Sequence, residues 1–467
     1  MRHSLRVSLA GLSLASSACM VGPRYERPVV SAPAAYRSDT AEFAHRESLA
    51  EAKWWEVFRD AELQRLIGGA LNENYDVSIA ATRVLQARAQ LAIARSTQLP
   101  TITGGAEVVR RKTPAAILGN FEIPSVTYNI FRIDATLSWE LDFWGKFRSA
   151  TDAQRANLLG TRWAARAVLV SVVDQVAQGY FTLRELDLEL EIARRTLDAR
   201  RESLQLTRVQ ERGGVVSMLD VREAEQLVDA AESVITNTER LIVQQENALS
   251  VLLGRNPTAI PRGLPLVDQP EPPEVPAGLP SSLLERRPDI RQAEQALIAA
   301  NANIGVAKAA YFPAITLTSN GGVQSNVLSR LFTAPATLLS VGADLVQPIF
   351  NAGRIRNTVR LTEEQKQELV FVYRRTILQA FGEVSDALIA YQKSRELRVQ
   401  LERLVASTGD AAQLSDVRYR GGVANYLEVL TNQTNYFNAQ LRLAQARLGE
   451  LLSLVQLYAA LGGGWEQ

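Results

Sequence analysis

A short motif occurs twice in this sequence and indicates its architecture. It reads Arg212-Gly213-Gly214-Val215 and returns 208 residues later as Arg420-Gly421-Gly422-Val423. In each copy an apolar and an acidic residue follow, at 219–220 and 427–428. Paired glycines permit a tight reversal of the chain, and a match at a fixed offset is typical of a duplicated unit. We therefore expect two copies of one unit, each reversing at its Gly-Gly pair.

The repeat continues on both sides of this motif. Gly145-Lys146 corresponds to Gly353-Arg354 at the same offset, and Arg95–Pro100 corresponds to Lys308–Pro313 at an offset of 213. In each repeat we expect a helix, two strands and a helical hairpin. The predicted segments are a signal peptide (1–18), an N-terminal segment (19–69), a first repeat (70–254), a proline-rich linker (255–282) and a second repeat (283–467).

The composition disfavours several classes of function. The 467 residues include 51 basic and 50 acidic side chains, so the charge balance does not favour a nucleic-acid partner. Cys19 is the only cysteine, and the chain has two histidines, His3 and His45. A disulfide within the chain is therefore excluded, and a Cys/His metal site or catalytic pair is not expected. We predict a protein that is not an enzyme and has no metal or cofactor.

Residues 1–18 read as an export signal, with a basic start, an apolar stretch and a run of small residues before Cys19. Cleavage there would leave Cys19 at the new N-terminus, and we expect its thiol to carry a lipid; the alternative is an ordinary signal peptide that ends near a cysteine. The pattern resembles a bacterial lipoprotein signal, although Ser16 stands where leucine is usual. Met20 follows instead of the aspartate that favours retention in the inner membrane, so we expect an outer-membrane destination.

Alternating segments predict strands that could cross a membrane. Beyond the signal, no run of 18 apolar residues occurs, which leaves a closed β-barrel as the way to cross a bilayer. Ile133–Asp142 and Leu339–Leu345 alternate apolar with polar or small residues, and Thr101–Arg111 and Ala314–Gln324 are weaker candidates. Four strands cannot close a barrel alone, so copies of the chain would have to share one. Composition alone favours an alternative in which the strands cap a soluble helical domain as two hairpins.

Long proline-free runs predict helices after each pair of strands. Lys146–Glu211 and Arg354–Tyr419 would each span ~100 Å if helical throughout. In the first run apolar residues recur every seven positions from Val176 to Leu204, as in coiled coils. The charged positions between them, including 184–185 and 200–202, are interpreted as a solvated face. After each Gly-Gly pair the chain should return along Ser217–Leu253 or Asn425–Leu461.

Three segments carry a resemblance to a known family. These are Cys19–Pro28, Trp54–Leu63 with its Trp-Trp and Phe-Arg-Asp-Ala-Glu-Leu motifs, and Leu283–Glu294 with its Arg-Arg-Pro-Asp-Ile-Arg core. They resemble the TolC-like outer-membrane factors, specifically the lipoprotein branch that serves resistance-nodulation-division efflux systems. The resemblance implies a mainly helical homotrimer in which four strands per chain form a shared twelve-stranded barrel, continued by a helical tunnel across the periplasm. It also implies two partners, a periplasmic adaptor protein and an inner-membrane efflux pump that supplies the energy.

By the same resemblance, function concentrates at the hairpin turns. Leu427 and Glu428 match positions that form a constriction in the family, and three copies of Glu428 on an axis would repel one another. Thr431 stands where relatives often have a second acid, while Leu219 and Asp220 are the first-repeat equivalents. The turns themselves would dock the adaptor.

Other readings remain open. The gate candidates could be ordinary helix surface, and the chain could be a lipid-anchored structural coiled-coil protein without a pore. Glu383 and Asp386 could form a hydrolytic carboxylate pair, although acids three apart on a helix are usually only solvated. The exported compound, the pump and the adaptor cannot be read from this sequence.

Overall fold

A computed structural model describes residues 20–33, 36, 53–118, 121–270 and 280–463. The signal peptide and Cys19 lie outside these residues. The described residues divide into two compact units: those within 1–29, 84–160 and 293–373 form the first, and those within 30–83, 161–292 and 374–467 form the second. Each unit therefore contains segments of both sequence repeats.

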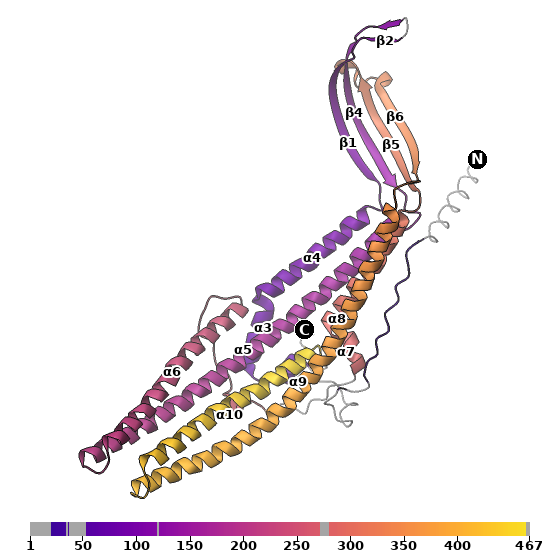
Figure 1. Cartoon of the computed structure of the whole chain (residues 1–467). Coiled ribbons are helices and arrows are strands. Elements are labelled where there is room, and N and C mark those ends of the chain that lie inside the picture. Colours follow the sequence, from indigo (N-terminus) through magenta and orange to yellow (C-terminus); the bar gives the residue numbers. More distant parts are fainter. Residues whose placement is uncertain (1–19, 34–35, 37–52, 119–120, 271–279, 464–467) are drawn as a thin grey trace. The chain divides into compact units, whose positions relative to one another are not determined.

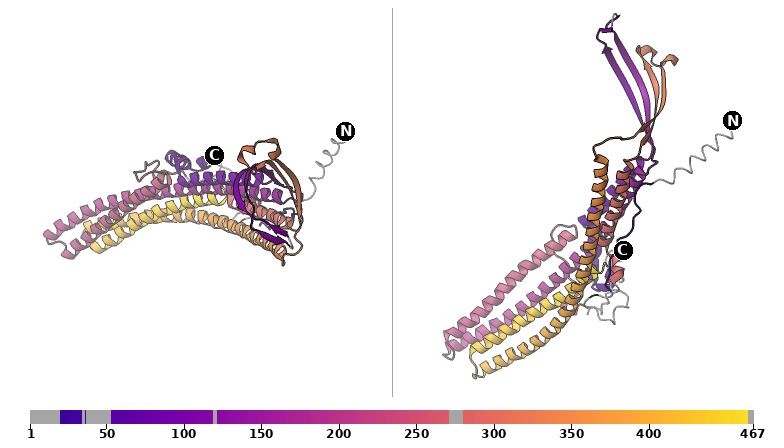
Figure 2. Two further views of the ribbon diagram at one scale, coloured as in Figure 1. Left: turned by 90° about the horizontal axis from the view of Figure 1, so that it is seen from above. Right: turned by 45° about the vertical axis from the view of Figure 1, so that its right-hand side comes forward.

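The first unit contains a four-stranded antiparallel sheet (Figures 1 and 2). Its strands are β1 (Thr101–Lys112), β4 (Thr127–Glu140), β5 (Ala314–Ser325) and β6 (Thr337–Val346), in the order β1-β4-β5-β6. All four predicted strands are present, and β4 begins six residues before the predicted start. A further ladder, β2 (Ala116–Leu118) with β3 (Phe121–Ile123), was not predicted.

The two faces of this sheet differ in chemistry, as the alternating sequence predicts. On one face Asp134 accepts hydrogen bonds from the side chains of Arg132, Thr136 and Asn320, with Nε of Arg132 at 3.1 Å from Oδ1. The neighbouring positions 133 and 135 point to the opposite, apolar face. The sheet therefore has one apolar and one hydrogen-bonding face.

The described start of the chain packs on the first unit as well. Arg27 pairs with Glu294 (Nε–Oε1, 2.6 Å), whose side chain is buried. The N–H of Val21 donates to the carbonyl of Trp144 at 3.4 Å. A β-carbon on Gly22 would lie 2.9 Å from the Cα of Gly305, so this close approach requires glycine.

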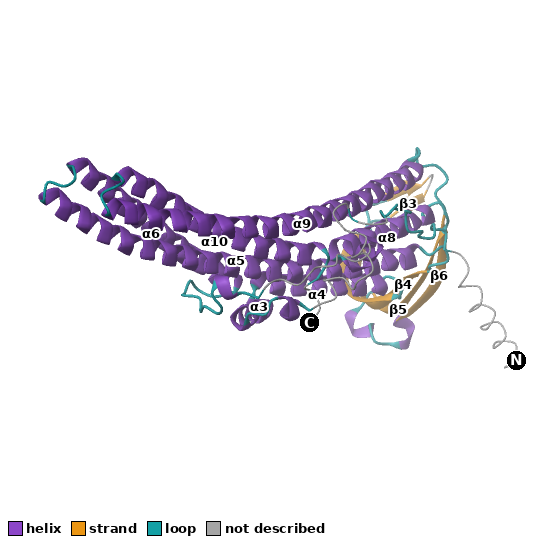
Figure 3. Ribbon diagram, turned by 90° about the horizontal axis from the view of Figure 1, so that it is seen from below, coloured by secondary structure: helices purple, strands orange, loops and turns teal. Residues whose placement is uncertain are grey.

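Long helices form most of the second unit, and four of them match the predicted hairpins closely (Figure 3). Helix α5 (Lys146–Arg212) reverses into α6 (Met218–Leu252), and α9 (Arg354–Arg420) reverses into α10 (Tyr426–Ala460). No described helix has an apolar stretch long enough to cross a membrane. Elsewhere in the described residues the helices are α2 (Trp54–Val57), α3 (Ala61–Glu73), α4 (Tyr75–Ser96), α7 (Pro280–Arg286) and α8 (Pro288–Ala309), with 3-10 turns η2 (Leu266–Asp268), η3 (Leu328–Arg330) and η4 (Ala334–Ala336).

The apolar residues at seven-residue spacing form the buried face of α5, as predicted. The prediction that the charged residues between them are solvated is wrong at three positions. Of the five positions at this spacing from Val176 to Leu204, four are buried and Leu190 is half-buried. Arg184, Glu185 and Arg200, predicted to be solvated, are buried too. The Nε of Arg184 donates to the carbonyl of Leu264 at 2.9 Å, so a segment distant in sequence covers it. Burial, with a contribution from the charge of Glu189, raises the pKa of Glu185 to about 7.

The proline-rich linker is only partly irregular. The predicted linker (255–282) ends inside a helix, because α7 begins at Pro280, and α8 follows from Pro288. A proline at the first position of a helix costs little because the N–H that it lacks has no helical partner there. Proline density therefore marked helix starts here as well as loops.

Asp60, from the Phe-Arg-Asp-Ala-Glu-Leu motif, links α3 to the linker. Its buried carboxylate caps α3 by accepting from the N–H of Glu62 at 2.9 Å. It also accepts from the Tyr180 hydroxyl at 2.8 Å and from the N–H of Leu264 at 3.0 Å. Burial opposes its ionisation, but hydrogen bonds from Gln269, Tyr180 and two backbone N–H groups outweigh burial and lower the pKa of Asp60.

We predict that Asp60→Ala lowers stability by about 3 kcal/mol, because a helix cap is lost and buried donors lose their acceptor. Because the folded-state pKa lies below the unfolded one, this stabilisation is present above the unfolded pKa and is lost as pH falls through the folded pKa. Melting curves followed by circular dichroism across acidic pH measure both effects. Glu62→Ala, which removes an ion pair with the half-exposed Arg65, is the control, with an expected cost of about 0.5 kcal/mol. Equal melting temperatures for the two variants would contradict the assignment.

Candidate functional site

The two Gly-Gly turns have the same backbone geometry. Gly214 and Gly422 adopt φ values of 73° and 72°, in the left-handed region that favours glycine. The N–H of Val215 donates to the carbonyl of Gln210 and the N–H of Val423 donates to that of Arg418, at 2.9 and 3.0 Å. This is the hydrogen bond that closes a helix in the Schellman motif. The duplicated motif is thus a duplicated helix end.

The acidic residues after the two turns make different contacts. Asp220 completes a capping box, accepting from the N–H and the hydroxyl of Ser217 at 2.8 and 2.6 Å. In the second copy Asn425 caps the helix, since its Oδ1 accepts from the N–H of Glu428 at 3.1 Å. The Glu428 carboxylate instead accepts from Nε of Arg418 at 3.1 Å. Asp220 therefore begins a helix, whereas Glu428 joins α10 to α9 across the turn.

The other predicted residues lie on the surface of the same hairpin ends. Leu427 and Leu219 are 53% and 66% exposed, and Val215 and Val423 are exposed as well. The hydroxyl of Thr431 donates to the carbonyl of Leu427 at 2.8 Å within its own helix. Each turn therefore presents apolar side chains to its surroundings.

Two tyrosines that the sequence reasoning missed connect the hairpins. The rings of Tyr419 and Tyr426 meet edge to face with centroids 5.3 Å apart. Tyr419 donates to Oε1 of Gln210 at 2.9 Å, and the hydroxyls of Tyr426 and Ser203 lie 3.3 Å apart. Both tyrosines thus bond to α5 from the second hairpin. A signal was available, because the equivalent first-repeat positions hold Glu211 and Met218.

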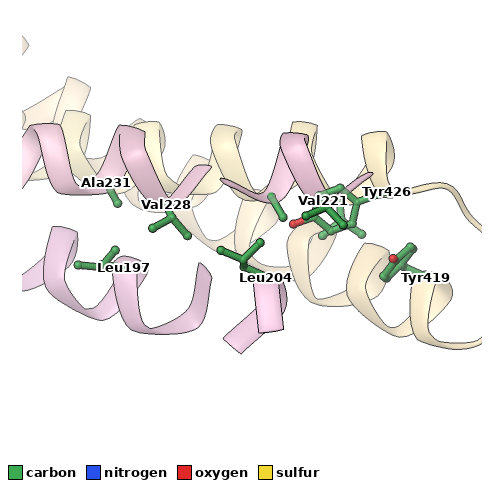
Figure 4. Close-up of a cluster of buried hydrophobic side chains, with 9 residues drawn as sticks. Leu197, Leu204, Val221, Val228, Ala231, Tyr419 and Tyr426 are labelled. Carbon is green, nitrogen blue, oxygen red and sulfur yellow. The ribbon is translucent and has the colours of Figure 1, made fainter. Parts of the chain in front are cut away.

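A buried apolar cluster surrounds this pair (Figure 4). Tyr426 is 1% exposed and packs with residues of α5 and α6, so each hairpin covers the apolar face of the other. The buried members are Leu197, Leu204, Val221, Ala224, Val228, Ala231, Tyr419, Tyr426 and Val429.

Arg200, predicted to be solvated, is a second missed residue. It lines a groove between α5, α9 and α10 with a cavity volume of about 700 Å³. Its guanidinium lies 4.9 Å from the centroid of the Phe437 ring, and its Nη1 donates to the carbonyl of Leu227 at 2.7 Å. Arg200 therefore joins α5 to both return helices.

Comparison with known proteins identifies the family. Residues 66–255 and 279–463 match the family model described as outer membrane efflux protein. The chain belongs to this family. The two matched segments coincide with the two repeats, and the resemblance inferred from sequence motifs is confirmed.

Relatives of this outer membrane efflux protein match along nearly its whole length. The probable efflux pump outer membrane protein TtgC of Pseudomonas putida is 37% identical, with 98% of this chain and 95% of the relative covered. The cation efflux system protein CusC of Escherichia coli is 33% identical, with 98% of each covered. The open state of the MtrE outer membrane channel of Neisseria gonorrhoeae superimposes with a TM-score of 0.85 at 30% identity, covering 96% of this chain and 99% of MtrE.

These matches confirm the TolC-like fold, the outer-membrane location and the role as channel component of a tripartite efflux system. The relatives named are efflux proteins and not enzymes. Glu383, one of the two acids considered for catalysis, pairs with Arg287 at 2.7 Å. The described residues contain no group of three or more His, Cys, Asp or Glu side chains suited to a metal. The roles of the gate, docking and lipidation residues stay predictions.

We predict that Tyr426→Ala destabilises the hairpin ends by about 3 kcal/mol, because a large buried aromatic side chain is lost. Met218→Ala is the matched control, since Met218 occupies the equivalent first-repeat position and is 52% exposed; its expected change is within about 0.5 kcal/mol. Hydrogen exchange of the α5–α6 and α9–α10 ends is the measurement. Faster exchange in both hairpins of Tyr426→Ala is expected, whereas a change confined to α10 would contradict the coupling.

Proposed function

We propose that three copies of this chain form one passive duct through the outer membrane. The free edges of the sheet carry this proposal. In the described sheet β1 pairs only with β4, and β6 pairs only with β5. Backbone groups left unpaired in hydrocarbon cost several kcal/mol each, roughly, so such edges need partners. Four strands are too few to close a cylinder, and three chains supply a number within the observed range.

The two faces of the sheet support the same assembly. In a closed cylinder the apolar face meets lipid, and the face with the Asp134 network lines the interior. Such a duct binds no energy source, so export depends on a pump in the inner membrane. In this proposal the duct itself performs no catalysis.

This assembly predicts that native mass spectrometry in mild detergent detects three chains per particle. The variant Val341→Pro, in β6, should be monomeric or unfolded. Proline removes a backbone N–H donor from an edge strand, where the proposed trimer needs it. Val341→Thr keeps the donor and serves as the control, which should remain trimeric. If the wild-type protein is a monomer and still conducts ions in planar bilayers, the proposal is contradicted.

We propose that the duct closes at the hairpin ends through Leu427 and Glu428. Three copies of Leu427 around an axis would form an apolar constriction. This side chain is 53% exposed in a single chain, so it is free to contact its counterparts in the other two chains. The pairing of Glu428 with Arg418 lessens the repulsion between neighbouring carboxylates. It also fixes the start of α10 relative to the end of α9. Opening then requires this link to break or to move with both helices.

For this gate we predict that Glu428→Ala raises resting conductance in planar bilayers several-fold, because the side chain and its link to Arg418 are lost together. Asp416→Asn is the control, since it removes an acid that pairs at 2.8 Å with Arg420 within α9 and does not bridge the helices. Arg418→Gln should resemble Glu428→Ala. Unchanged conductance in both Glu428→Ala and Arg418→Gln would remove this pair from the gate.

Membership of this family also suggests the partners and the exported compounds. We propose that the exposed turns, with Val215 and Val423 at their ends, dock a periplasmic adaptor, and that a lipid on Cys19 anchors the chain. The names of relatives mention antibiotics, toluene and cations. Because these cargoes share no chemistry, we place their selection in the pump and not in this duct.

A further inference from the structure

Three consecutive cationic residues end strand β1 at the loop end of the sheet. Arg110, Arg111 and Lys112 are exposed, and within the described part of the chain none of them forms an ion pair or a side-chain hydrogen bond. Two other cations of this unit do pair, Arg132 with Asp134 and Lys146 with Glu140. Among the described side chains, the positive charge at the end of β1 is therefore uncompensated.

The strand register divides these three residues between the two faces. Arg110 pairs with Asn129 and Lys112 with Thr127, two and four positions beyond the pair Val108–Phe131. Side chains two apart on a strand share a face. Arg110 and Lys112 thus continue the apolar face outward from Val108, whereas Arg111 lies on the face of the Asp134 network.

The extent of the apolar face places this charge at its border. From Trp139 to Phe131 the face runs about 27 Å along β4, which is about 20 Å along the membrane normal at a tilt of about 40°. Outer-membrane proteins have an apolar band roughly 25 Å tall. Arg110 stands about 5 Å and Lys112 about 10 Å beyond its last apolar row, at the depth of lipid headgroups.

The opposite border is built differently. There the Nε1 of Trp139 donates to the carbonyl of Gln98 at 3.0 Å, and the ring of Trp144 stacks on Phe312 with centroids 4.6 Å apart. Aromatic side chains of this kind lie at membrane interfaces. All four strands join their helices at this end, so the helix-bearing side is periplasmic and the cationic border meets the outer leaflet.

We propose that Arg110 and Lys112 bind the phosphate groups of a phosphorylated glycolipid in the outer leaflet. An arginine can hold a phosphate through two parallel hydrogen bonds and a lysine adds a mobile point charge. The acyl chains of the same lipid would cover Val108 and Phe131. This inference rests on the proposed orientation of the sheet in the outer membrane.

Binding of purified lipid A to the full-length protein in detergent, followed by native mass spectrometry, tests the proposal. Arg110→Gln/Lys112→Gln should weaken binding about 30-fold, since each cation near an anionic surface contributes about fivefold. Arg111→Gln is the matched control, because it removes the same charge from the adjacent position on the other face, and it should bind like the wild type. Lipid A from which the phosphates have been removed should bind the wild type as weakly as bisphosphorylated lipid A binds the double variant.

The outcomes separate this inference from the channel proposal. Single-channel conductance of the double variant should be that of the wild type, which shows that the duct is intact. Undiminished lipid A binding by a conducting double variant would overturn the site, and so would an equal loss in Arg111→Gln. Equally tight binding of phosphatidylglycerol to the wild type would overturn the choice of a glycolipid. If the wild-type protein itself shows no conductance, the channel proposal is contradicted instead.

Discussion

The pairing of β4 with β5 is the interaction on which the sheet depends, because it joins the two repeats. Each repeat contributes two strands, and this ladder runs from Phe131–Ser325 to Glu140–Thr316. The backbones approach so closely that a β-carbon on Gly322 would lie 2.2 Å from the carbonyl oxygen of Ile133. On the polar face, Asn320 of β5 donates to both Asp134 and Thr136 of β4. Side-chain and backbone bonds thus specify one register, and a slip of one residue would put Asp134 on the apolar face.

Duplication explains the common backbone, and divergence explains the chemistry at the hairpin ends. Both turns close with a left-handed glycine and the same hydrogen bond. After the turn, however, Asp220 is used within its own helix start while Glu428 reaches the neighbouring helix. Tyr419 and Tyr426 likewise exist in one copy only, and both bond to the other hairpin. The turn of the first repeat therefore makes local contacts, and that of the second makes the contacts that couple the two hairpins.

Much of this fold could be predicted from the sequence because its elements are long and periodic. The boundaries of α5 and α9 follow from proline-free runs that end at Gly-Gly pairs, and the positions of β4 and β6 follow from alternation of apolar with polar or small residues. The errors lie where tertiary packing decides. Arg184 and Arg200 look solvated on a single helix, but residues far away in sequence cover them and accept their hydrogen bonds. The β2–β3 ladder was missed because three-residue strands have no period to detect.

The sequence predicted that the candidate residues lie near the turns, but it did not predict which side chains they contact. Repeat symmetry located Leu427, Glu428 and their first-repeat equivalents near the turns. It could not show that Arg418 binds Glu428, because the equivalent position to Arg418 in the first repeat is Gln210. Departures from internal symmetry were the better signal for contacts between the hairpins, and the tyrosine pair is the clearest of them.

The packing of the described N-terminal residues sets the reach of any anchor. Val21 is bonded to the carbonyl of Trp144, and Met20 lies so close to Gly145 that a β-carbon there would be 2.7 Å from its Cγ. Consecutive Cα atoms are about 3.8 Å apart. The attachment point of a fatty acid on the residue before Met20 would therefore be confined to within a few ångströms of that contact. The tether and the tryptophans at the helix-bearing border would then act at one height, and the duct could neither sink nor rise in the bilayer without straining both.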